Sequence, residues 1–225
     1  MKKPQIGKHV DIGYFNKILK VRSKVAKKRN ILNKIEAWKL GKEYYDGARI
    51  NGYGGFKYDG RWLKLLPQIL KNYKITKNSK FLDLGCKKGY LLKDLNKLMP
   101  GIKSYGVENH PYPLKKIKNL KNKKKLSNYY ELPFKDKHFD FVIAFNSIYM
   151  QSLGDVVKTL QEINRVSKKS YIVLASGENE KEIYKFYKWT LIGTTIQLKK
   201  DWIKLFKKVG YKGDYYFSSS KSLGI

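Results

Sequence analysis

A glycine turn between an apolar strand and an amphipathic helix constrains the fold of this chain more than any other feature. Residues 80–109 read as a strand, a turn bounded by Gly85 and Gly89, a helix over 90–98 and a second strand that ends at Glu108. In such a βαβ unit a buried parallel strand delivers a tight turn at its carboxyl end. Glycines let the turn approach a ligand, and the following helix offers unpaired N–H groups. The pattern predicts a nucleotide-like cofactor site.

The spacing of this turn disfavours two common phosphate sites. A dinucleotide fingerprint needs a second glycine against the pyrophosphate, and Cys86 or Lys87 stands there instead. A P-loop needs Gly-Lys-Ser or Gly-Lys-Thr, whereas Lys87 and Lys88 precede Gly89. A nucleoside ligand without phosphates remains. Glu108, at the end of the second strand, can accept hydrogen bonds from both hydroxyls of a ribose.

From about Phe81 through Lys169 the chain resembles the class I S-adenosylmethionine-dependent methyltransferases. The matching elements, in order, are Asp83-Leu84-Gly85-Cys86-x-x-Gly89, the acid Glu108, the polar Asn128 before Leu132-Pro133-Phe134, and the strand Phe139 to Asn146. Lys87 departs from the family pattern because most members carry glycine there, and Asn128 replaces a common aspartate. The resemblance implies S-adenosyl-L-methionine as the cofactor, held by Asp83, Gly85, Cys86, Gly89, Glu108, Asn109, Asn128, Tyr129 and Asn146.

The resemblance also implies the fold and the organisation of the chain. We expect a Rossmann-like, doubly wound α/β fold with a mostly parallel seven-stranded sheet, an antiparallel C-terminal hairpin and a helical N-terminal extension. The extension is expected over 1–75 and the methyltransferase domain over 76–225. Apolar residues at roughly helical spacing between Ile18 and Trp38 predict helices in the extension. The basic run over 115–125 is interpreted as a solvated helix and loop.

Residues 43–62 combine glycines, aromatic side chains and two arginines. Glycines permit tight turns, and aromatic rings supply flat amphipathic surfaces. This composition favours a lid over the bound cofactor, in which Tyr53, Tyr58 and Arg61 are the candidate lid or substrate residues. Arg61 is expected to pair with a carboxylate of the cofactor or of the acceptor. A surface loop that packs on the core is the alternative interpretation.

The formal net charge of +31 would ordinarily indicate nucleic acid or an anionic membrane as the partner. Nearly all of the 49 basic residues are lysine, however, and the abundance of Lys, Asn, Ile and Tyr resembles an AT-rich coding bias. Arginine, which suits bidentate recognition of phosphates and bases, is scarce. Nucleic acid therefore stays as the alternative acceptor, and a small molecule is favoured.

Other features limit the class of protein. The length of 225 residues and an apolar content of 42% suit one α/β domain with a modest extension. The single cysteine, Cys86, has no partner for an internal disulfide or a structural zinc site. The sequence has no apolar run of membrane-spanning length and no signal-peptide pattern. We expect a cytoplasmic protein, and the oligomeric state stays open.

Methyl transfer from a sulfonium is an in-line displacement, which requires positioning and exclusion of water more than a nucleophile. Asn146 and Tyr149 are the catalytic candidates, and His110 and Glu178 are further candidates for a base. Asn146-Ser147-Ile148-Tyr149 keeps the amide and the ring of base-methylating enzymes but lacks their two prolines. This pattern favours a small-molecule acceptor. An RNA or DNA methyltransferase is the first alternative, and an inactive cofactor-binding scaffold is the second.

Overall fold

A seven-stranded sheet organises the computed structural model, which describes residues 6–14, 20–52, 57–117 and 120–225. The strands are β1 (Lys80–Leu84), β2 (Lys103–Glu108), β3 (Asn122–Lys125), β4 (Phe139–Phe145), β5 (Ser167–Gly177), β6 (Gln197–Leu198) and β7 (Asp214–Ser218). Their order is β3-β2-β1-β4-β5-β6, and β7 also pairs with β5. This arrangement confirms the predicted α/β fold with a mostly parallel sheet.

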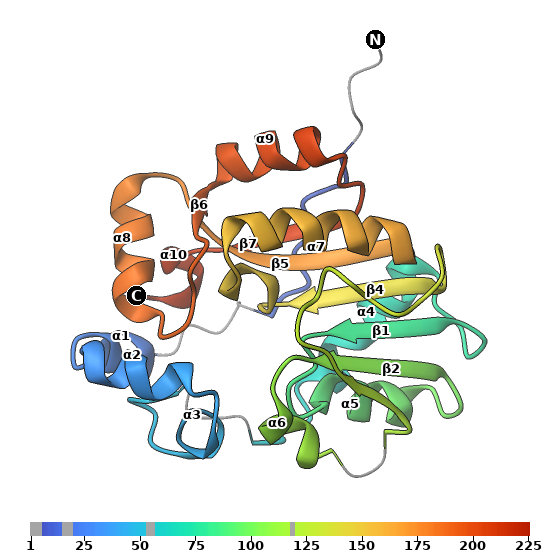
Figure 1. Ribbon diagram of the computed structural model, residues 1–225, viewed down its shortest axis with the longest axis horizontal. Helices are drawn as coiled ribbons and strands as arrows, with labels where there is room; N and C mark the ends of the chain where they lie inside the picture. Colours follow the sequence, from blue (N-terminus) through green and yellow to red (C-terminus); the bar gives the residue numbers. More distant parts are fainter. Residues whose placement is uncertain (1–5, 15–19, 53–56, 118–119) are drawn as a thin grey trace.

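Helices flank the sheet and gather beyond the ends of the strands (Figure 1). They are α1 (Lys20–Ala26), α2 (Ile31–Trp38), α3 (Lys42–Asp46), α4 (Trp62–Tyr73), α5 (Tyr90–Leu98), α6 (Pro111–Lys115), α7 (Leu153–Val166), α8 (Glu180–Trp189), α9 (Lys199–Val209) and α10 (Ser220–Leu223), with a 3₁₀ turn at Ile148–Met150. No helix in the described ranges is long and apolar enough to cross a membrane.

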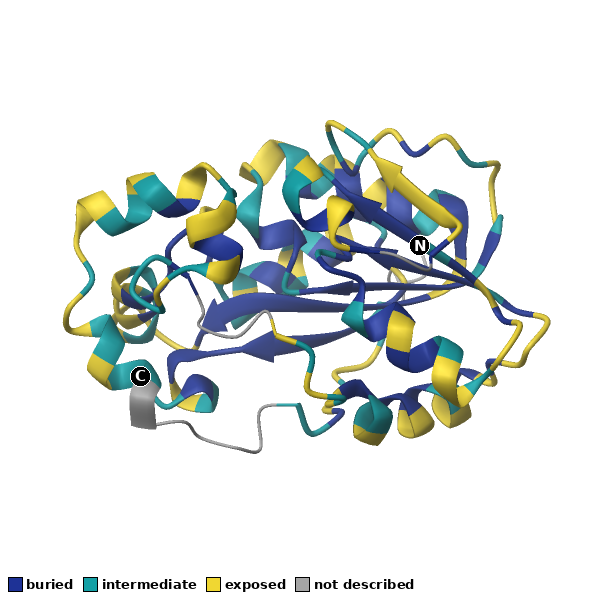
Figure 2. Ribbon diagram, turned by 90° about the horizontal axis from the view of Figure 1, so that it is seen from below, coloured by how far each residue is buried: buried dark blue, intermediate teal, exposed yellow. Residues whose placement is uncertain are grey.

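The central strands are buried on both faces, as Figure 2 shows in dark blue. Parallel strands that lie between two layers of helices have mostly apolar sequences, and β1 and β4 are of this kind. Phe81, Leu82 and Phe141 are fully buried there. The helix predicted over 90–98 from its amphipathic pattern is α5, with the same bounds in the structure. Local pattern therefore determines the middle of the sheet.

The edge strand β3 corrects the interpretation of the basic run over 115–125. Asn122–Lys125 pairs in parallel with β2, with Glu108 opposite Lys125. All four residues of β3 are exposed, and the strand has no apolar alternation that could reveal it in the sequence. The free edge of β2 supplies the pairing. Lysines suit such a position, because charged side chains on an edge strand oppose pairing with another chain.

The C-terminal strand also differs from the expected antiparallel hairpin. β7 pairs in parallel with β5, from Tyr171 opposite Asp214 to Ala175 opposite Ser218. The helix α9 lies between the two-residue β6 and β7 and returns the chain to the starting end of the sheet. A connection of this kind produces parallel strands, whereas a hairpin needs a short turn. All strand pairings in the part of the chain that the structure describes are parallel.

The N-terminal extension contacts the rest of the chain at separate places. Near its start, the Val10 N–H donates to the Tyr215 carbonyl at 2.8 Å, and His9 forms an isolated bridge with Tyr215 of β7. Farther along, α2 and α3 bury a small cluster against the segment after α8. The cluster contains Ala37, Tyr44, Tyr45, Leu191 and Ile192. The helices α1, α2 and α3 lie beyond the carboxyl ends of β1 and β4, toward which the strand arrows point in Figure 1.

Candidate cofactor and acceptor site

A cleft of about 330 Å³ opens at the carboxyl ends of β1 and β4. Open α/β sheets bind their ligands in this position. The lining residues at the ends of the strands, here called the strand wall, are Asp83, Gly85, Cys86, Lys87 and Asn146. Those from the N-terminal extension, here called the extension wall, are Tyr14, Arg22, Arg49, Tyr58, Arg61 and Trp62. The predicted site residues that line the cleft are Tyr58, Arg61, Asp83, Gly85, Cys86, Asn146 and Tyr149. The two walls come from different parts of the chain.

The turn after β1 packs directly on the turn after β4. Gly85 has a φ of +83°, and a Cβ built on it would lie 2.3 Å from the Ser147 Cβ. Ser147 is buried and donates a hydrogen bond of 2.7 Å from its hydroxyl to the Leu84 carbonyl. Glycine is thus required at position 85 by both backbone conformation and space. The close approach brings Asp83 and Asn146 to the same cleft.

Glu108 lies at the end of β2, is 3% exposed, and is not among the residues that line the cleft. Its Oε2 accepts a hydrogen bond from the Lys87 N–H at 2.9 Å, and its Oε1 accepts from the Asn109 and His110 N–H groups at 2.9 and 3.3 Å. The Tyr129 hydroxyl also donates to Oε1, at 3.3 Å. Burial raises the pKa of Glu108, and the backbone donors partly offset that shift. A carboxylate has about four acceptor positions, so Oε2 keeps capacity for a ligand hydroxyl.

Asp83, near the end of β1, is buried on the strand wall. Burial raises the pKa of Asp83 to about 7, and the negative charge of Glu108 adds to the shift while Lys87 opposes it. The carboxyl group therefore changes charge near neutral pH. A positively charged ligand group in the cleft would favour its ionised form.

Asn146, directly after β4, has an unusual backbone and an unusual side chain. Its φ is +51°, in the left-handed region that side-chain-bearing residues adopt at a free-energy cost. Its Oδ1 is buried and has no hydrogen-bond partner among the described residues. The Asn146 carbonyl accepts from the Lys87 ammonium at 3.4 Å. A strained backbone and an unsatisfied acceptor on a cleft wall are both typical of a ligand site.

The four candidates for a catalytic base separate into two groups. Tyr149 is buried, lines the cleft with Asn146, and its carbonyl accepts from the Thr195 N–H at 2.9 Å. His110 instead caps the start of α6, where its Nδ1 accepts from the Tyr112 N–H. Glu178 is exposed and pairs with Lys199. The structure brings Asn146 and Tyr149 to the cleft, and His110 and Glu178 are not among its lining residues.

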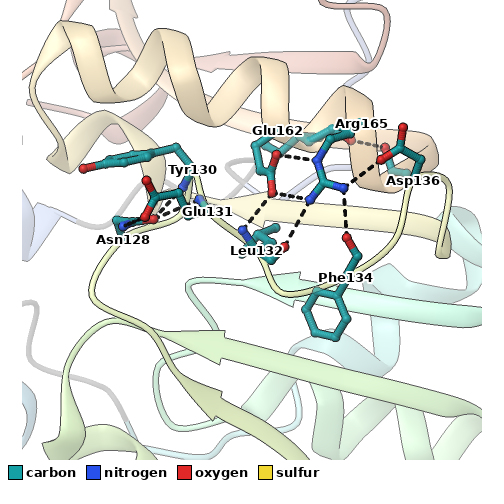
Figure 3. Close-up of polar contacts among 10 residues, drawn as sticks. Asn128, Tyr130, Glu131, Leu132, Phe134, Asp136, Glu162 and Arg165 are labelled. Carbon is teal, nitrogen blue, oxygen red and sulfur yellow. Dashed lines mark hydrogen bonds and ion pairs between the residues drawn. The ribbon is translucent and has the colours of Figure 1, made fainter.

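The amide of Asn128 holds a local turn (Figure 3). Its Oδ1 accepts from the Tyr130 and Glu131 N–H groups, and its Nδ2 donates to Glu131 at 3.1 Å. The same loop is fixed at Arg165, which donates to the Leu132 carbonyl and pairs with Glu162. The turn places the neighbouring Tyr129 against Glu108. The predicted contact between Asn128 and adenine stays a prediction.

Of the predicted lid residues, Tyr53 lies outside the described residues. The Tyr58 hydroxyl donates to Asp94 at 2.6 Å and thereby fastens the lid segment to α5. Arg61 is held by Asp59, to which it donates from Nε and Nη2 at 2.9 and 2.7 Å. The carboxylate that Arg61 contacts in this structure thus belongs to its own loop.

A second fastening of the extension was not predicted from the sequence. Asp46, at the end of α3, pairs with Lys88 of the glycine turn and accepts from the Tyr112 hydroxyl at 2.8 Å. The rings of Tyr45 and Tyr112 stack with centroids 6.0 Å apart. Burial and the charge of Glu108 raise the pKa of Tyr45. We call Tyr45, Asp46, Lys88 and Tyr112 the latch. The only sequence signal for it is that the chain has few acids, 18 against 49 basic residues, which makes each acid a candidate for an ion pair.

Comparison with known proteins decides the family. The family description "Methyltransferase domain" matches residues 75–210, which is more than half of the chain. The chain belongs to the class I S-adenosylmethionine-dependent methyltransferase family. No curated protein matches it. Within the described residues no group of three or more His, Cys, Asp or Glu side chains could hold a metal ion.

Solved structures of other methyltransferase-fold proteins share the architecture. An S-adenosylmethionine-dependent methyltransferase from Archaeoglobus fulgidus has a TM-score of 0.52 and 20% identity, over 77% of this chain and 73% of that one. The YcgJ protein from Bacillus subtilis has a TM-score of 0.52 and 16% identity, over 67% and 68%.

A chain of the Haloferax volcanii complex that contains the Trm112 methyltransferase activator has a TM-score of 0.52 and 21% identity, over 64% and 65%. The present chain thus spans slightly less than two thirds of that neighbour. At these identities the likeness establishes the fold, and the acceptor has to be argued from the cleft itself.

Proposed function

We propose that this protein transfers a methyl group from S-adenosyl-L-methionine to a small-molecule acceptor bound in the cleft. The observation that carries this proposal is the convergence on one cleft of the Gly85 turn and the unsatisfied Oδ1 of Asn146. A volume of about 330 Å³ lies within the range of small-molecule sites. The matched family supplies the cofactor class.

Residues at the ends of β1, β2 and β4 suit this cofactor. Glu108 is held by backbone donors, and its Oε2 keeps acceptor capacity for a ribose hydroxyl. Gly85 leaves the backbone bare beside the methionine part of the cofactor, and Cys86, Gly89, Asn109, Asn128 and Tyr129 are proposed to complete the site. Asn146 offers its Oδ1 to an N–H or O–H group of a bound molecule. When bound, the cofactor supplies an electrophilic methyl group.

Apart from binding the cofactor, the protein has to position the acceptor atom in line with the methyl group. Asn146 and Tyr149 lie on one side of the cleft and would orient the acceptor for in-line attack. The extension wall and the latch would exclude water once both molecules are bound. We propose that residues 76–225 form the catalytic unit and that the extension acts as its lid.

Calorimetric titration with S-adenosyl-L-methionine tests the proposal. The wild type should bind in the micromolar range, and Glu108→Ala should weaken binding at least about thirtyfold, because two ribose hydroxyls lose a charged acceptor. Glu178→Ala is the matched control, since Glu178 is exposed and pairs with Lys199, whereas Glu108 is buried against the glycine turn. A wild type that does not bind the cofactor, or a Glu108→Ala variant that binds as tightly as the control, would contradict the proposal.

A further inference from the structure

Arginine is distributed very unevenly over this molecule. The sequence contains five arginines, at positions 22, 29, 49, 61 and 165, among 49 basic residues. Three of them, Arg22, Arg49 and Arg61, line the cleft. Lysine would supply the same charge and is far more abundant in this chain. The presence of arginine in the cleft therefore favours a role for the planar guanidinium group, which binds carboxylate and phosphate groups with two hydrogen bonds.

The other two arginines have structural partners that explain them. Arg165 fixes the loop of Leu132 and Phe134. Arg29 donates to the carbonyls of Arg49, Ile50 and Gly52. Arg29 therefore holds the backbone of the loop that carries the Arg49 side chain into the cleft.

The charge of Arg61 is matched by Asp59, but the charge of Arg22 is not matched in the same way. The Nη1 of Arg22 donates to the Leu223 carbonyl of α10 at 3.2 Å, which orients the group without neutralising it. Within the described residues Arg22 forms no ion pair, and the segments outside them contain no Asp or Glu. Partial burial lowers the pKa of Arg22, Tyr14 opposes that shift, and the neighbouring charges of Arg49 and Arg61 add to it. An anion bound beside neighbouring positive charges stabilises them.

We propose that Arg22 and Arg49 form an anion subsite that binds a carboxylate or phosphate group of the methyl acceptor. The inference deepens the proposed function and rests on it, because it assigns the acceptor to the class of anionic small molecules. The subsite and the pair Asn146 and Tyr149 line the same cleft, so an acceptor held by its anionic end can present its other end toward Asn146 and Tyr149.

The test measures anion binding to the protein saturated with S-adenosylhomocysteine, in 150 mM NaCl to screen surface lysines. Inorganic phosphate and glutarate are the two probes, and the one that binds more tightly identifies the chemical group. Arg22→Met and Arg49→Met should each weaken that probe by about tenfold or more, and Arg22→Lys should weaken it less. Lys204→Met, on exposed α9 outside the cleft, is the matched control and should bind as the wild type does.

Two outcomes would overturn the inference. Equal probe binding by the wild type and both arginine variants would mean that surface lysines hold the anion. If the variants weaken S-adenosylhomocysteine but not methylthioadenosine, which lacks a carboxylate, the arginines bind the cofactor instead of the acceptor. Thermal unfolding of each variant, with Arg22→Lys as the conservative replacement, separates loss of the subsite from loss of folding.

Failure of the proposed function gives a different result. The wild type would then bind neither S-adenosylhomocysteine nor methylthioadenosine. The titration with phosphate and glutarate is repeated without cofactor in that case. Loss of binding in Arg22→Met and Arg49→Met would still establish an anion subsite, whereas unchanged binding would exclude it.

Discussion

The two walls of the cleft are held in place by different means. The strand wall is fixed by the backbone: Gly85 packs on Ser147, and the Lys87 N–H donates to the buried carboxylate of Glu108. The extension wall is fixed by side chains, such as Tyr58 on Asp94 and Asp46 on Lys88. A wall built into the sheet should open only when the domain unfolds, whereas a wall held by a few side-chain contacts can open locally.

This difference suits a methyltransferase that must admit and release two molecules. The strand wall would keep the proposed cofactor contacts constant between turnovers. The extension wall carries Arg22 and Arg49, and its local opening would give the acceptor a path into the cleft. Four substitutions separate the two walls, and they follow in decreasing order of expected effect.

Gly85→Ala should have the largest effect, because its Cβ would lie 2.3 Å from the Ser147 Cβ at a φ of +83°. Gly101→Ala is the matched control, with a φ of +85° and no atom within 4 Å of its Cβ. We expect about 1 kcal/mol of destabilisation for the control and at least about 3 kcal/mol more for Gly85→Ala, in urea unfolding. Equal losses would mean that the strand wall is not tightly packed.

Asp83→Asn should change how stability depends on pH. The pKa of Asp83 in the folded protein, about 7, exceeds its ordinary value of 3.8, so the native state binds the proton more tightly. Protonated Asp83 therefore contributes its full share to the free energy of unfolding below about pH 4, and this contribution is lost as the pH rises through 7. The variant should be more stable than the wild type at pH 8, by at most about 4 kcal/mol.

Asp140→Asn is the control for this experiment. The hydrogen bond from Lys168 lowers the pKa of Asp140, and the Lys80 N–H adds to the shift. Its contribution is thus present above its ordinary pKa and lost as pH falls, so the control should be less stable than the wild type at neutral pH. The two variants should shift urea midpoints in opposite directions. A shift of the same sign would contradict the assignment of Asp83.

Arg29→Met should open the extension wall while leaving the sheet intact. Arg29 donates to carbonyls in the loop 49–52, and hydrogen bonds from a charged donor contribute about 2 kcal/mol. Hydrogen exchange should become faster in that loop but not in β1 or β4. Arg165→Met removes a comparable set of bonds far from the cleft and should accelerate exchange around 132–136 instead. Uniform acceleration in Arg29→Met would show that both walls unfold together.

Asp46→Asn should have the smallest effect, since it weakens one ion pair of the latch and keeps a group that can accept from Tyr112. We expect a loss of about 1 to 2 kcal/mol in global stability, because the buried Lys88 ammonium loses a charged partner but keeps an amide acceptor, together with faster cofactor dissociation in stopped-flow measurements. Asp201→Asn, which removes an exposed pair with Lys204, is the control and should leave dissociation unchanged. Unchanged dissociation in both variants would show that the latch does not gate the cofactor.

Local sequence patterns were sufficient for the elements that build the strand wall. A window of about ten residues is enough to recognise each of these elements in the sequence. They are the apolar strands β1 and β4, the amphipathic helix α5 and the acid that ends β2. The order of these elements was enough to bring Asp83, Gly85 and Asn146 to one edge of the sheet. Hydrophobic periodicity reports burial along a short segment, and these segments are buried as predicted.

By itself, then, the sequence determined the family, the central strands of the sheet and the strand wall of the cleft. Only the tertiary structure decided that the lysines of β3 form a strand, that β7 runs parallel to β5, and that Asp46 meets Lys88. It also decided that Arg22 and Arg49 line the same cleft as the ends of the strands. The physical reason is that these features depend on partners far away in the chain, such as a free strand edge or a carboxylate 42 residues distant. The sequence around an exposed charged residue has no local pattern from which a distant partner could be predicted.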